Sequence, residues 1–89
     1  MNIVFAKGIM ETMDYFTDRM VEAARKYNIS TYVMDVQNPQ SYLCEEFISF
    51  ISAPECMAFF FNQIGMGLSD ENGSIWTKYG VPVYDFIVD

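Results

Sequence analysis

Histidine is absent from this sequence, and positive charge is scarce. Five lysine and arginine residues stand against twelve aspartate and glutamate residues, so the formal net charge is −7 over 89 residues. Without histidine, the common Ser–His and Cys–His catalytic arrangements cannot be assembled. Nucleic-acid phosphates are bound by clustered cations, and the few cations here are scattered along the chain. We therefore expect no catalytic residue and no nucleic-acid partner.

Cysteine is rare, and long apolar runs are missing. Cys44 and Cys56 match no metal-ligand spacing, so we expect two free, buried thiols, no metal site and a cytoplasmic location. No stretch approaches the roughly 20 apolar residues that span a bilayer. Residues 1–8 lack the basic start and the long apolar core of a signal peptide. These absences predict a protein without a membrane span.

Apolar side chains, in contrast, are abundant. Hydrophobic residues make up 52% of the chain and aromatic residues 17%, whereas average domains are about 45–50% apolar. A short chain has more surface to cover with polar groups, so this surplus indicates apolar area that needs a partner. We expect that partner to be a missing C-terminal domain or a second copy of the chain.

The apolar pattern alternates between strand-like and helix-like segments. Short runs rich in β-branched and aromatic residues predict strands. These runs cover residues 2–6, 30–36, 56–62 and 81–88. A stripe of apolar residues at three- and four-residue steps predicts a helix over residues 10–27, and a third, short helix follows at residues 75–79 after a polar loop over residues 63–73.

The second predicted helix lies between the second and third strands. Asn38 is expected to cap it, Pro39 suits its first turn, and Pro54 ends it. The side chains expected to form its buried stripe are Leu43, Phe47, Phe50 and Ile51.

Strands separated by helices pair in parallel. We expect an α/β fold with an open, parallel four-stranded sheet in the order 2-1-3-4 and three helices, Rossmann-like or flavodoxin-like. The order 3-2-1-4 remains open. In the favoured order the first helix covers one face and the others cover the opposite face, so half of the first face has no cover. Residues 1–89 are thus expected to form a single Rossmann-like α/β domain or the N-terminal fragment of one, so that the fold is incomplete.

Ligands of open parallel sheets bind beyond the carboxyl ends of the strands, where the strand order reverses. In the favoured order this point lies between the loop after the first strand and the loop after the third. The candidate ligand-binding residues in these loops are Lys7, Gly8, Asn62, Gln63, Gly65 and Gly67. Gly8 serves either a tight strand-to-helix turn or the close approach of an anion to a helix N-terminus.

No nucleotide cofactor is expected in these loops. Gly65-Met66-Gly67 follows the third strand rather than the first, and Asp70 stands where a dinucleotide fingerprint has its third glycine. A phosphate-cradling G-x-x-x-x-G-K-S/T loop is also absent from the sequence.

The segment I-W-T-K-Y-G-V-P-V-Y-D-F-I-V-D, residues 75–89, combines a tryptophan, a Gly-x-Pro turn and an apolar strand that ends in aspartate. It resembles the N-terminal region of bacterial glycosyltransferases of the GT-B fold, in the group similar to spore-maturation proteins. The order of strands and helices fits this resemblance over the whole chain, whereas the sequence motif covers only residues 76–89. It implies a Rossmann-like half that binds mostly the acceptor, while a second half across a cleft holds the nucleotide-sugar donor.

Two functional hypotheses follow from these observations. In the first, the chain is the acceptor-side part of a glycosyltransferase, is inactive on its own, and meets a sugar or nucleotide-sugar ligand only in the full-length protein. In the second, it is a stand-alone flavodoxin-like binding or interaction module that dimerises through a bare aromatic face. A reading frame that continues past Asp89 into His-Pro and a second α/β half favours the first hypothesis.

Overall fold

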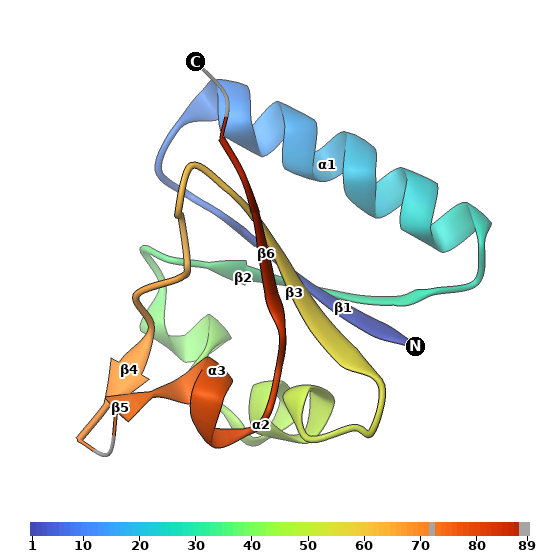
Figure 1. Ribbon diagram of the computed structural model, residues 1–89. Helices are drawn as coiled ribbons and strands as arrows, with labels where there is room; N and C mark the ends of the chain where they lie inside the picture. The colour runs from blue at the N-terminus through green and yellow to red at the C-terminus, as the bar shows by residue number, and fades with distance from the viewer. Residues whose placement is uncertain (72, 88–89) are drawn as a thin grey trace.

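The computed structural model describes residues 1–71 and 73–87 and shows an α/β fold built on four parallel strands (Figure 1). The sheet has the order β2-β1-β3-β6, which is the expected order 2-1-3-4, and the alternative 3-2-1-4 is excluded. Its strands are β1 (Asn2–Lys7), β2 (Ser30–Asp35), β3 (Cys56–Phe61) and β6 (Val83–Phe86).

The helices lie on both faces of this sheet, as expected. Figure 1 shows α1 (Glu11–Lys26) on one side and α2 (Glu45–Ile51) and α3 (Ile75–Lys78) on the other. Acidic residues in the first turn of α1 and basic residues in its last turn suit the helix dipole. Within residues 1–71 and 73–87, no helix combines the length and the apolar character needed to cross a membrane.

The larger part of the core lies between the sheet and the pair α2 and α3. Phe60 of β3 is fully buried there, 5.3 Å from the ring of Trp76 of α3, and the ring of Phe47 of α2 lies 6.0 Å from Trp76. Since these aromatic rings come from three elements, they join the sheet to both short helices. The fully buried Val4 and Ala58 extend this core along β1 and β3.

The opposite face, which we call the α1 face, is covered only in part. Under α1, Phe5 packs with Val21 and Ala24. Tyr84 and Phe86 of β6 stand beside Phe59 and Phe61 of β3, and they remain 54% and 57% exposed. The three consecutive phenylalanines of β3 therefore reach both faces as expected, and the edge of the α1 face carries exposed aromatic surface.

The second predicted helix is wrong in its first half. Asn38 does cap a helix, because its side chain accepts a hydrogen bond from the Gln40 N–H at 3.2 Å, but this is the short 3-10 helix η1 (Pro39–Ser41). Ser41 then turns the chain back to β2, since its Oγ accepts from the Asp35 N–H at 2.9 Å and its carbonyl accepts from the Tyr32 hydroxyl at 2.5 Å. Leu43, expected in the buried stripe, is consequently 71% exposed.

Two further differences concern the last third of the chain. The polar loop predicted for residues 63–73 contains the start of a small antiparallel hairpin, formed by β4 (Ser69–Asp70) and β5 (Gly73–Ser74). The two strands have only two residues each, too short for a hydrophobic alternation to reveal them. The fourth strand of the main sheet covers Val83–Phe86 rather than residues 81–88, and residue 88 lies outside the described residues.

Phe47→Ala and Leu43→Ala test this assignment of the second helical segment. Phe47 is fully buried, so its truncation is expected to lower the free energy of unfolding by about 3–5 kcal/mol. Leu43→Ala removes an exposed side chain and is expected to cost less than about 0.5 kcal/mol. Urea denaturation followed by circular dichroism measures both. Similar losses for the two variants would place Leu43 in the core and contradict the split helix.

Candidate functional site

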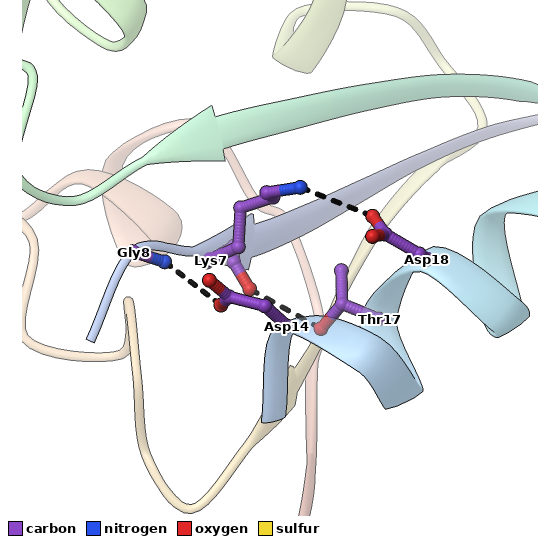
Figure 2. Close-up of polar contacts among 6 residues, drawn as sticks. Lys7, Gly8, Asp14, Thr17 and Asp18 are labelled. Atoms are coloured by element: carbon purple, nitrogen blue, oxygen red, sulfur yellow. Dashed lines mark hydrogen bonds and ion pairs between the residues drawn. The ribbon is translucent and has the colours of Figure 1, made fainter. Parts of the chain in front are cut away.

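The loop after β1 is held by side chains of α1. Lys7 Nζ pairs with the Asp18 carboxylate at 3.1 Å, and the Gly8 N–H donates to Asp14 Oδ1 at 2.9 Å (Figure 2). The buried Thr17 hydroxyl donates to the carbonyl of Ala6 at 3.4 Å. Lys7 Nζ and the Gly8 N–H are the groups that could meet an anionic ligand. Both already bind carboxylates of the chain itself.

Gly8 is required by a close approach as well as by its backbone angle. Its φ is 115°, in a region that favours glycine, and a Cβ at this position would lie well inside van der Waals distance of the Asp35 carboxylate. Gln37 adds to this contact, because its side-chain amide donates to the Gly8 carbonyl while its backbone N–H donates to Asp35 Oδ1 at 2.9 Å. The loop after β1 thus packs against the end of β2.

The loop after β3 begins with two residues in the left-handed region, Asn62 at φ 50° and Gln63 at φ 64°. The Gln63 N–H donates to Asp85 Oδ1 of β6 at 2.7 Å. The Asn62 side-chain amide lies 3.4 Å from the sulfur of Met13 on α1. These two residues therefore fasten the loop to β6 and α1.

Gly65 brings the same loop across the end of β1. It adopts φ 99°, and a Cβ built there would lie 3.0 Å from both the Ala6 Cβ and the Phe60 ring. The indole N–H of Trp76 donates to the Gly65 carbonyl at 3.0 Å. A side chain at position 65 would push the loop off the sheet, so the small residue and the tryptophan together set the height of this loop.

A cleft of about 270 Å³ opens where this loop faces the end of β2. It is lined by Met34, Val36, Tyr42, Gly65, Gly67 and Leu68. None of these side chains is charged, and the aromatic ring of Tyr42 is the largest group among them. The arrangement can accept an uncharged molecule that combines apolar and hydrogen-bonding surface.

The six residues predicted from the sequence thus separate into two groups. Gly65 and Gly67 line the cleft, whereas the other four are bound into the chain by the contacts described above. Ligand binding by any of the six stays a prediction. Tyr42 was missed because the expected continuous helix hid the turn that brings it to the cleft. The Asn38-Pro39 pair, which can start either kind of helix, was the available signal.

The two cysteines are free thiols in different surroundings. Cys44 is partly exposed before the first turn of α2, and its contacts with the Tyr32 hydroxyl, 3.4 Å from its sulfur, and with the Phe47 backbone N–H lower the pKa of its thiol. Burial raises the pKa of the Cys56 thiol, and burial together with the Cys44 contact raises the pKa of Tyr32 to about 12. Cys44 thus has more thiolate character at neutral pH than Cys56. The expectation of two free, buried thiols is correct for Cys56, whereas Cys44 is only partly buried.

Comparison with known proteins adds no relative to this picture. Neither the family models, nor the curated proteins, nor the solved structures gave a significant match to the chain. Over residues 1–71 and 73–87, no group of three or more Cys, Asp or Glu side chains is placed to hold a metal ion.

Gly8→Ala tests the close packing of the first loop. The backbone angle and the contact with Asp35 both oppose a methyl group at this position, so we expect the free energy of unfolding to fall by about 1–3 kcal/mol. Gly67→Ala is the matched control, because a Cβ there meets nothing within 4 Å, and it is expected to change stability by less than about 0.5 kcal/mol. Thermal denaturation of both variants measures these changes in stability. An equal or larger loss in Gly67→Ala would contradict the loop geometry.

Proposed function

We propose that this chain is the acceptor-side, Rossmann-like part of a glycosyltransferase and is inactive on its own. The observation that carries the proposal is the uncharged cleft beside the carboxyl ends of the strands, lined by Gly65 and Gly67. This edge of an open parallel sheet is where ligands of such folds bind. A sugar acceptor presents hydroxyl groups and apolar C–H surface, which an uncharged cleft of this kind can receive.

The electrostatics of the first loop agree with an acceptor side rather than a donor side. A nucleotide-sugar donor carries a diphosphate, which requires cations or free backbone amides. Lys7 and the Gly8 N–H are the groups of this loop suited to that task, and Asp18 and Asp14 bind them. The diphosphate of a donor would therefore be held by another part of the enzyme.

The residues that carry the resemblance also help to build the cleft. Trp76 belongs to the motif that is similar to glycosyltransferases, and its indole holds the Gly65 carbonyl at 3.0 Å. The same ring packs on Phe60 of β3. The motif and the cleft are thus parts of one packed unit, which supports a common functional origin.

Labelled nucleotide sugars provide the test of this proposal. The product of the complete reading frame is expected to release the nucleotide and to transfer or hydrolyse the sugar, whereas the 89-residue chain alone is expected to do neither. Thin-layer and mass-spectrometric detection of released nucleotide and sugar serve both samples. No turnover by the complete product with any common donor would contradict the glycosyltransferase proposal, and turnover by the isolated chain would contradict its assignment to the acceptor side.

A second candidate, a homodimeric interaction module, is favoured by the α1 face. Beside the exposed rings of Tyr84 and Phe86, an almost entirely apolar groove of about 210 Å³ runs between α1 and the sheet. Met20, Tyr27 and Phe59 are among its lining residues. Residues 1–29 contain four cations and four carboxylates, so the charge of −7 comes from the rest of the chain. The part of a contact between two copies that residues 1–29 form would therefore bring no net charge together.

Sedimentation equilibrium over a wide concentration range tests the homodimer. We expect the 89-residue chain to form dimers and Phe86→Glu to be monomeric, because a charge would then be buried in the contact. Leu43→Glu is the control, since Leu43 is even more exposed but belongs to the segment between η1 and α2 on the other side of the sheet. A chain that stays monomeric at every concentration would rule this candidate out.

A further inference from the structure

The lining of the cleft beside Gly65 points to a particular kind of ligand. We propose that it binds one uncharged sugar ring, with the apolar face of the sugar against the Tyr42 ring and its hydroxyl groups toward the Tyr42 hydroxyl and the backbone at Gly67. This inference rests on the proposed function and names the chemical class of the acceptor and the residue that selects it.

Charge is the first argument for an uncharged ligand. None of the six lining residues is an aspartate, glutamate, lysine or arginine, and Lys7 of the neighbouring loop is paired with Asp18 at 3.1 Å. A phosphate or carboxylate in the cleft would lose water without gaining a cation, which is strongly unfavourable. Nucleoside diphosphates and acidic sugars are therefore poor ligands for this cleft.

Size is the second argument. The cleft measures about 270 Å³, just below the about 300–1,000 Å³ that is typical of pockets for drug-sized ligands. A single ring fits this volume, and a longer saccharide would extend from the cleft into solvent.

The available contacts are the third argument. Tyr42 is partly exposed, and within residues 1–71 and 73–87 its hydroxyl makes no hydrogen bond. Apart from residues 66–68, no described residue has an atom within 4 Å of where a Gly67 Cβ would stand, so a ligand can come close to the backbone there. Met34, Val36 and Leu68 provide apolar contact. An aromatic ring with a polar end, beside open backbone, matches a sugar, which has apolar C–H faces and polar edges.

Amide chemical shifts measure this binding directly on the 89-residue chain. With methyl glucoside or methyl N-acetylglucosaminide we expect the amides of Gly65, Gly67 and Leu68 to shift, with a dissociation constant on the order of 1 mM for so small a ligand. Uridine diphosphate is expected to leave these amides unchanged. Shifts with uridine diphosphate, or with a purely apolar ligand such as benzene in place of the glycosides, would overturn the inference.

Variants at position 42 identify the selecting residue. Tyr42→Phe keeps the ring and is expected to weaken binding about threefold through the lost hydrogen bond, while Tyr42→Ala is expected to weaken it about tenfold or more. Tyr84→Ala removes an exposed tyrosine from the α1 face and is the control without effect. Unchanged affinity in both Tyr42 variants would contradict the role of Tyr42.

The same variants in the complete reading-frame product separate this inference from the proposed function. If the product transfers sugar and both Tyr42 variants leave the acceptor KM unchanged, the inference fails and the glycosyltransferase proposal stands. If the isolated chain binds glycosides at the cleft with the expected loss in Tyr42→Ala, the inference stands even where the complete product shows no transfer.

Discussion

The height of the loop after β3 above the sheet is the constraint on which the candidate site depends. Gly65 can lie against Ala6 and the Phe60 ring only because it has no side chain, and the Trp76 indole N–H binds its carbonyl. The aromatic core therefore has a second role besides stability. It carries the loop across β1 toward the end of β2, and the cleft is the space left between the loop and the turn at Tyr42.

Two parts of the surface, the loop after β1 and the α1 face, differ in whether the chain's own residues contact the groups that could bind a partner. At the loop after β1, carboxylates of α1 bind the Lys7 ammonium and the Gly8 N–H, so they compete with any anion for these two groups. At the α1 face the aromatic side chains of β6 remain in contact with water. Residues of one helix satisfy the polar groups of this loop, whereas the Tyr84 and Phe86 side chains of β6 stay more than half exposed.

The general architecture could be predicted from the sequence, because it depends on patterns that repeat over many residues. The apolar runs of β1 and β3 and the stripe of α1 identify their elements, and the parallel order then follows from alternation and from the flavodoxin-like analogy. The turn at Ser41 could not be predicted in this way. Its geometry depends on hydrogen bonds to Asp35 and Tyr32. A helix prediction uses the spacing of apolar residues and takes no account of such bonds.

The position of the cleft was beyond prediction for a related reason. The topology indicated the space between the loops after β1 and β3, but Gly65 fills the place above β1 and moves the opening toward β2. Glycine content alone shows where the chain can bend, not what it will pack against. Only the meeting of Gly65 with Ala6, Phe60 and Trp76, residues from three elements, determines the outcome.

Nuclear magnetic resonance of the unliganded chain tests this packing most directly. Trp76 is the only tryptophan, so its indole proton gives a single, unambiguous signal. The structure predicts slow exchange of this proton with solvent and nuclear Overhauser effects from the Gly65 α-protons to the Ala6 methyl group and the Phe60 ring. An indole proton that exchanges as fast as in free tryptophan, without these effects, would show that the loop does not lie on the sheet and would contradict the account of the cleft.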